Sequence, residues 1–193
     1  MTTMGTLYEF AFRGMLAEEA LDRTGRLHPN VAGALDQEFA ERLAVDALDE
    51  TFVAAARQMA VVYMAVAAFE NSVRKLISTV LLEKVGESWW DTCVSAGIRK
   101  KVENRQKDEE RVKWHTQRGA SPITYTDLGD LTNIIRNAWP HFEAYIPSIE
   151  WAAGLLDVVE RSRNVIMHSG NLTKVDVERI GINIRDWVKQ VGS

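Results

Sequence analysis

Apolar side chains recur at steps of three or four residues along one unbroken stretch from Asp49 to Lys84. An α-helix turns once every 3.6 residues, so this spacing places the apolar side chains on one helical face. A helix of this length would extend for roughly 50 Å. We therefore expect the stretch to form the central column of a helical domain, with an inward face made of Phe52, Ala56, Met59, Tyr63, Val66, Phe69, Val73, Leu76, Ile77 and Val80.

The remaining sequence also favours helices. Only four prolines occur, and no alternating strand pattern with a hairpin turn stands out. We predict an acid-rich helix from about residue 35 to 48, a short helix at Trp89-Trp90, and a charged helix from about residue 98 to 118. The fold class is thus predicted to be all-α: an antiparallel helical bundle over residues 51–193 with an N-terminal helical extension over residues 1–50, which includes a first helix near residues 7–21.

Capping residues give the expected starts of the last three helices. Thr124 or Thr126 can cap a helix that Pro140 closes, and Ser148 can cap the next helix. Thr173 with Asp176 resembles a capping box at the start of the final helix.

Composition excludes several classes of protein. The chain has 193 residues, 46% of them hydrophobic, which is enough for a sizeable core. The single cysteine, Cys93, rules out an internal disulfide framework, and no Cys/His cluster has zinc-ligand spacing, so no metal or cofactor is expected. The longest apolar run, residues 59–69, is shorter than the ~18 residues that span a bilayer. We expect a soluble, cytoplasmic protein.

Charge is unevenly distributed along the chain. The formal net charge of −4 argues against general affinity for DNA. Residues 97–118, however, hold eight basic and four acidic side chains, a local balance of +4. Lys100, Lys101, Arg105 and Lys107 are therefore candidate contacts to an RNA backbone. A solvated helix with internal ion pairs accounts for the same charges at least as well.

The run from Arg163 to His168 joins a permanent cation to a titratable imidazole near the end of an amphipathic helix. An imidazole can take a proton from a ribose 2′-hydroxyl or give one to the departing 5′-oxygen. A guanidinium can stabilise the charge that develops on the phosphate between them. The pattern alone is weak, because Arg23 to His28 and Arg136 to His141 have the same spacing; the former lies in a Gly/Pro loop and Pro140 breaks the helix of the latter.

Helical geometry arranges the three polar residues of this run. Asn164 and His168 lie one turn apart on a shared face, where Asn164 could fix the imidazole tautomer or contact phosphate. Arg163 lies about 140° around the helix axis from His168. Two copies of the helix brought together would combine groups from both subunits in one cleft. The simpler alternative is an exposed arginine and a C-terminal histidine that favours the helix dipole.

Several motifs together resemble a known family. They are Ala68-Phe69-Glu70-Asn71-x2-Arg74-Lys75-Leu76-Ile77, Tyr125-x2-Leu128-Gly129-Asp130-Leu131, Trp139-Pro140-x-Phe142, and Pro147-Ser148-x-Glu150-Trp151 ahead of Glu160-x2-Arg163-Asn164-x3-His168. With them, residues 59–187 resemble a HEPN domain (higher eukaryotes and prokaryotes nucleotide-binding). The branch is the one named after a eukaryotic nuclear endoribonuclease that acts in transcript surveillance.

This resemblance implies a self-pairing helical bundle that cleaves RNA without a metal ion, or in some members a scaffold that has lost catalysis. Arg163, Asn164 and His168 match the superfamily's catalytic signature. The expected products are a 2′,3′-cyclic phosphate and a 5′-hydroxyl, the expected partners are RNA, a second copy of the chain and an antitoxin or regulatory protein, and the expected settings include toxin systems and phage defence. The alternative is a non-catalytic RNA- or protein-binding dimer scaffold.

Glu70 interrupts the apolar face of the long helix. It could reach the motif helix and orient Arg163 or His168 as a supporting acid. A salt bridge with Arg74, one turn further along the same helix, is the simpler interpretation.

Overall fold

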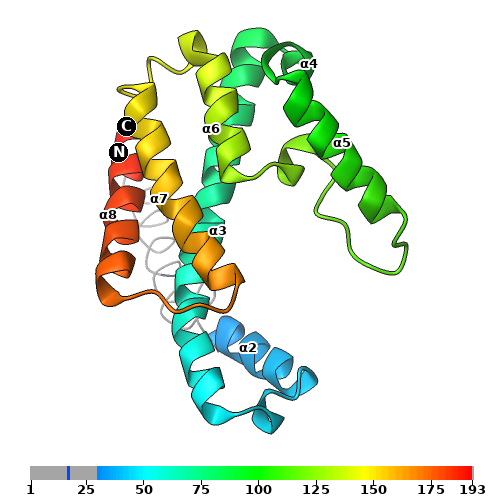
Figure 1. The fold of residues 1–193 in the computed structure, drawn as a ribbon, viewed down its shortest axis with the longest axis vertical. Helices are drawn as coiled ribbons and strands as arrows, with labels where there is room; N and C mark the ends of the chain where they lie inside the picture. Colours follow the sequence, from blue (N-terminus) through cyan, green and yellow to red (C-terminus); the bar gives the residue numbers. More distant parts are fainter. Residues whose placement is uncertain (1–16, 18–29, 193) are drawn as a thin grey trace, which may run out of the picture. The chain divides into compact units, whose positions relative to one another are not determined.

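The structure is a computed structural model that describes Ala17 and residues 30–192 (Figure 1). Its regular elements over these residues are all helices, as the sequence predicts. The chain divides into two compact units, residues 1–54 and 55–193. The predicted domain boundary at residues 50/51 stays a prediction.

The first unit contains α2 (Asn30–Arg42) and the short 3₁₀ helix η1 (Val45–Ala47). The predicted helix over residues 35–48 is thus shifted and interrupted, because Ala44 takes a left-handed backbone conformation with φ 51°. The helix predicted near residues 7–21 lies outside the described residues, apart from Ala17.

The long helix is confirmed as α3 (Glu50–Val85). Asp49 stabilises its start, because the Asp49 carboxylate accepts a hydrogen bond from Thr51 N at 2.9 Å. Gly86 follows the last residue with φ +87°, a conformation that glycine adopts without steric cost. The buried face of α3 consists of Met59, Val62, Val66, Phe69, Glu70, Val73, Ile77, Val80 and Leu81. The expected inward face is therefore wrong at Phe52, Ala56 and Tyr63, which are exposed.

By length and composition alone, α3 could also cross a bilayer. Its most apolar 18-residue window has a mean hydropathy of 1.6, and 22% of that window is buried. One such helix is weak evidence, because the core helix of a soluble protein passes the same test. The expectation of a soluble cytoplasmic protein stays a prediction.

The charged helix is shorter than predicted. After α4 (Trp89–Cys93), α5 runs from Ala96 to Glu110 and not to residue 118. The chain reverses beyond Glu110, and Arg118 returns to Glu109 through an ion pair of 2.7 Å and a backbone hydrogen bond of 3.1 Å. The Arg118 guanidinium also lies 5.7 Å from the centre of the Tyr125 ring. These tertiary contacts replace the last turns of the predicted helix.

The next α-helix is α6 (Leu128–Asn137), and the 3₁₀ helix η2 (Pro122–Tyr125) precedes it in the chain. Asp127 caps the start of α6 in place of the predicted threonines. The Asp127 and Asp130 side chains form a capping box, whereas the Thr126 hydroxyl donates to Ile123 O. The 3₁₀ helix η3 (Trp139–His141) follows, in agreement with a helix that ends before Pro140.

The last two helices are α7 (Ile149–Met167) and α8 (Lys174–Val191), which pack against each other. Ser148 caps α7, and Thr173 with Asp176 forms the predicted capping box of α8. α8 runs back alongside α7, and α7 also lies beside α6 (Figure 1).

Three aromatic rings link α3, α7 and α8. The Trp187 ring stacks on Trp151 at a centroid distance of 5.9 Å and meets Phe69 edge to face at 5.8 Å. Trp187 is 2% exposed. Through Trp187 of α8, these two contacts link α7, which carries the Arg163–His168 run, to the central helix α3.

Candidate functional site

Arg163 lies on the face of α7 that turns toward α3. Its Nε is 3.3 Å from Glu70 Oε2, and the Glu70 side chain is 7% exposed. The Arg163 side chain is 33% exposed, so the guanidinium is held at the edge of the fold and still reaches solvent. The structure thus brings together two of the residues that the sequence singled out.

Glu70 is shared between two arginines. Its second oxygen, Oε1, pairs with Arg74, one turn further along α3. Arg74 also donates to Thr126 O at 2.7 Å and to Asn71 Oδ1 at 3.0 Å. Both sequence interpretations of Glu70 therefore hold in geometry: it forms the local salt bridge with Arg74 and it also contacts the motif helix.

A small hollow adjoins this cluster. It has a volume of about 160 Å³ and lies between α3 and the Arg163 side chain. Seven residues line it: Tyr63, Val66, Ala67, Glu70, Asn71, Arg74 and Arg163.

His168 ends α7 within a Schellman motif. Ser169 has φ 60°, Ser169 N donates to Ile166 O at 3.0 Å, and Gly170 N donates to Val165 O at 2.8 Å. A Cβ atom at Gly170 would lie 2.9 Å from Val165 O, so the turn requires glycine for close approach. The backbone position of His168 is thereby fixed.

The His168 side chain is exposed and so is Asn164. The His168 backbone N–H donates to Asn164 O at 3.2 Å, as expected for residues one turn apart. Within residues 30–192, no hydrogen bond joins the His168 imidazole to the Arg163 guanidinium. One chain therefore presents the cation beside α3 and the imidazole at the helix end.

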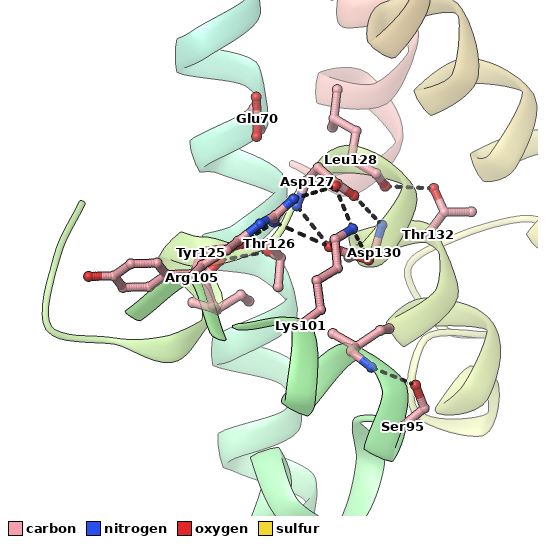
Figure 2. Close-up of polar contacts among 12 residues, drawn as sticks. Glu70, Ser95, Lys101, Arg105, Tyr125, Thr126, Asp127, Leu128, Asp130 and Thr132 are labelled. Atoms are coloured by element: carbon pink, nitrogen blue, oxygen red, sulfur yellow. Dashed lines mark hydrogen bonds and ion pairs between the residues drawn. The ribbon is translucent and has the colours of Figure 1, made fainter. Parts of the chain in front are cut away.

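Two of the predicted RNA contacts form an intramolecular network (Figure 2). Lys101 Nζ lies 2.7 Å from Asp127 Oδ2 and 2.9 Å from Asp130 Oδ2. Arg105 donates to Tyr125 O at 2.5 Å and to Asp127 Oδ2 at 3.3 Å. These contacts join α5 to the start of α6, so both side chains have a structural role; their role in RNA binding stays a prediction.

Electrostatics within this network favour the charged forms. Burial opposes ionisation of Asp127, but hydrogen bonds from Lys101 Nζ and the Asp130 backbone outweigh it and hold the pKa of Asp127 far below its ordinary value. Burial likewise opposes the charge on Lys101, and the bonds to both aspartates more than offset it, so the pKa of Lys101 is raised.

Lys100 and Lys107 lie on exposed positions of the same helix. Lys107 forms an ion pair with Glu103, one turn earlier, with both side chains 58% exposed. Exposed pairs of this kind are weak and readily exchanged for another anion. These two lysines are better placed than Lys101 and Arg105 to meet a phosphate backbone.

Glu160 connects the motif helix to the start of α6. Its carboxylate accepts a backbone hydrogen bond from Gly129 and would lie 3.3 Å from a Cβ atom at that position. Burial, followed by the nearby charges of Asp127 and Asp157, raises the pKa of Glu160.

Arg163 and His168 thus lie on one helix of an all-helical bundle, and an acid of the central helix, Glu70, pairs with the arginine. The model of the Swt1-like HEPN family matches residues 64–192, about two thirds of the chain, and the protein belongs to this family. Family membership suggests a ribonuclease-type function. Comparisons with curated proteins and with solved structures give no significant match.

Several residues of the site carry no clear signal in the sequence. Tyr63 and Asn71 lie on the long helix, where helical periodicity alone does not reveal a hollow beside Arg163. Asp127 and Asp130 could have been found, because two acids three residues apart before an apolar run are typical of a helix start. The contact of Glu160 with Gly129 depends on tertiary packing.

Proposed function

We propose that this protein is a metal-independent endoribonuclease that leaves a 2′,3′-cyclic phosphate and a 5′-hydroxyl. The ribose 2′-oxygen forms a bond to phosphorus while the bond from phosphorus to the 5′-oxygen breaks. His168 takes the proton from the 2′-hydroxyl or gives one to the 5′-oxygen, Arg163 stabilises the added charge on the phosphate, and Asn164 assists.

The observation that carries this proposal is the support given to Arg163. The carboxylate of Glu70, 5% exposed as a residue, lies 3.3 Å from Arg163 Nε, whereas the remaining guanidinium hydrogens can face a ligand. A preorganised cation of this kind acts without reorganisation during the reaction. The Arg74 side chain, which pairs with the other oxygen of Glu70, is by comparison only 15% exposed.

The complete site would be formed by two copies of the chain, with Arg163 and His168 of each contributing to a shared cleft. Exposed apolar side chains near the motif support a homodimer: Val165 is 39% exposed and Met167 is 53% exposed. Val61 and Met64 on α3 are 62% and 64% exposed. These side chains are the candidate contacts between two copies of the chain.

The biological setting that we propose is a cytoplasmic toxin or phage-defence effector, restrained by an antitoxin or another regulatory protein. Expression of such an enzyme should slow growth of the host cell, and His168→Ala should relieve this effect. The second candidate is a non-catalytic dimer scaffold that binds RNA or protein through the same surface. The exposed Val165 and Met167 would serve that function equally.

The decisive experiment incubates purified protein with labelled structured RNAs in EDTA. Wild-type protein should cut them, and an RNA with deoxyribose at the scissile position should resist. His168→Ala and Arg163→Ala should each lower turnover by at least ~10² with unchanged helical content. Arg161→Ala, an exposed arginine on the same helix, and His141→Ala should retain activity.

The outcomes separate the two candidates. Cleavage of the deoxy substrate would refute attack by the 2′-hydroxyl. Full activity of His168→Ala, or RNA binding without any cleavage by wild-type protein, would favour the scaffold.

A further inference from the structure

Trp114 is the most exposed large hydrophobic side chain among the described residues. It is 86% exposed and lies in the loop of residues 111–121, which joins α5 to η2 (Figure 1). Within this loop, Val112 is the other exposed large hydrophobic residue, at 37%. Nearly the whole surface of an indole ring system, the largest among the amino acids, therefore faces solvent at this point.

The loop holds this ring in a defined orientation. His115 N donates to Val112 O at 3.1 Å, which closes a tight turn around Trp114. The His115 imidazole meets the Trp114 ring at a centroid distance of 5.5 Å and an interplanar angle of 79°. The Nδ1 atom of His115 donates to Thr116 O at 2.9 Å. An aromatic side chain that is already positioned loses little conformational entropy when it binds a partner.

The charge of the loop favours an anionic partner. Residues 111–121 contain Arg111, Lys113 and Arg118 and no acidic side chain. Arg111 and Arg118 pair with acids at the end of α5, at 3.2 and 2.7 Å. Lys113, directly before Trp114, is exposed and forms no ion pair with any residue that the structure describes. A cation beside an open aromatic ring is the combination that holds single-stranded nucleic acid, through its phosphates and its bases.

The small size of the apolar surface favours a base over a protein as the partner. A stable protein interface buries about 800 Å² on each partner and has an apolar core. Apart from Trp114 and Val112, the exposed residues of the loop are polar, charged or small. One nucleobase, in contrast, can stack on a single indole ring. The base must be unpaired, because a duplex covers the faces of its bases.

We propose that Trp114 is a stacking platform for an unpaired base of the RNA and that Lys113 contacts a neighbouring phosphate. The inference rests on the proposed function, which supplies RNA as the ligand. Trp114 belongs to the loop after α5, whereas Arg163 and His168 belong to the α7 region. The platform therefore binds the RNA outside the scissile bond, and Trp114 touches no reacting atom.

A binding experiment tests the stacking contact without catalysis. Two fluorescent strands of about 12 nucleotides are compared by anisotropy. One is an unstructured mixed-sequence RNA with 2′-O-methyl sugars, which cannot attack their own phosphates, and the other has the same backbone without bases. Trp114→Ala should weaken binding of the base-bearing strand about tenfold and that of the abasic strand by less than about twofold. Trp114→Phe, which keeps an aromatic ring, should restore most of the affinity.

Two further variants separate stacking from charge and from general effects of the substitution. Phe52→Ala is the matched control, because Phe52 is an aromatic side chain of similar exposure, 76%, outside the loop. It should bind both strands as wild-type protein does. Lys113→Ala should lower the slope of log K against log salt by about 0.7, whereas Trp114→Ala should leave this slope unchanged. Circular dichroism should show the same helical content in all variants.

The binding outcomes decide on the platform. An unchanged affinity of Trp114→Ala for the base-bearing strand would overturn the inference and point to a protein partner for the loop. Equal weakening for the two strands would also overturn it, because the bases would then contribute nothing at Trp114.

Cleavage assays separate this inference from the proposed function. Trp114→Ala should raise KM for RNA about tenfold and leave kcat unchanged, since the contact is equal in the ground state and the transition state. A base-dependent contribution of Trp114 to binding, without any cleavage by wild-type protein, would support the platform and refute the nuclease. Cleavage by wild-type protein without that contribution would overturn the platform and leave the nuclease intact.

Discussion

Glu70 Oε2 lies 3.3 Å from Arg163 Nε, and this ion pair joins the middle of α3 to the last turns of α7. The two residues are far apart in sequence, and the contacts of Trp187 with Trp151 and with Phe69 link the two helices that carry them. The orientation of the predicted catalytic arginine therefore depends on a residue of the central helix.

Removal of the Glu70 charge should affect both stability and activity. Glu70→Gln leaves Arg74 and Arg163 without their shared counter-charge, and because Arg163 is partly exposed we expect a loss of about 1–3 kcal/mol in the free energy of unfolding. RNA cleavage should fall by about tenfold or more. Urea unfolding and cleavage assays measure the two effects. Glu83→Gln, an exposed acid on the same helix, is the control, and equal behaviour of the two variants would contradict the assigned role.

The Schellman motif predicts opposite effects for two neighbouring substitutions. Ser169→Gly should raise the free energy of unfolding by up to about 1 kcal/mol, because glycine adopts a positive φ without steric cost. Gly170→Ala should lower it by about 1–3 kcal/mol, since the new methyl group would meet Val165. Cleavage by Gly170→Ala should fall through displacement of His168. Thermal unfolding measures both shifts, and a stable, fully active Gly170→Ala would contradict the motif's role.

The ion pairs of Asp127 at the start of α6 should contribute less to the free energy of unfolding in acid. The pKa of Asp127 is lower in the folded than in the unfolded protein, so its contribution is present above the ordinary aspartate pKa of about 4 and declines as the pH falls below it. Asp127→Asn keeps an effective N-cap and removes the charge, and should cost about 1–2 kcal/mol at pH 7. Unfolding of both proteins across a pH series should show this difference shrink in acid. A difference that stays constant with pH would contradict a contribution from the ion pairs of Asp127.

Glu160 should show the opposite dependence on pH. Its pKa is raised in the folded protein, so its contribution to stability is present at low pH and is lost as the pH rises through that raised value. Glu160→Gln keeps an oxygen for the Gly129 N–H and cannot ionise. The stability of this variant relative to wild type should increase from about pH 4 to pH 7. Denaturant unfolding at each pH tests this, and a flat difference would rule out a buried, repelled carboxylate.

The exposed lysines of α5 can be tested by the salt dependence of RNA binding. Loss of one phosphate contact on a single strand lowers the slope of log K against log salt by about 0.7. If Lys100 and Lys107 each contact a phosphate, their double alanine variant should lose about 1.4 from the slope. Replacement of Lys84 and Lys174, outside this helix, is the control. An unchanged slope in the α5 variant would exclude both contacts.

The sequence predicts the helices that local signals define. α3, the Ser148 cap and the Thr173–Asp176 capping box were accessible, because periodicity and capping act over a few neighbouring residues. The end of α5 was not, since Arg118 leaves the helix to contact Glu109 and Tyr125, and only the folded chain brings these together.

In the candidate site, too, the sequence reveals some of the residues and only the folded chain reveals the others. Arg163, Asn164 and His168 could be selected from one helical run and its resemblance to a family, and Glu70 from its interruption of an apolar face. The pairing of Lys101 with Asp127 and Asp130 links positions 26 and 29 residues apart. No local pattern distinguishes such a structural lysine from one that binds RNA.

The sharing of one carboxylate between two guanidiniums leaves an excess positive charge. Glu70 carries one negative charge against the two positive charges of Arg74 and Arg163, which gives this group a formal balance of +1. The protein as a whole has a formal charge of −4, and solvent ions screen its distant acids over about 8–10 Å. An approaching polyanion would thus be attracted to this group although the protein as a whole carries the same sign of charge as the polyanion, which favours binding at defined positions over general adhesion.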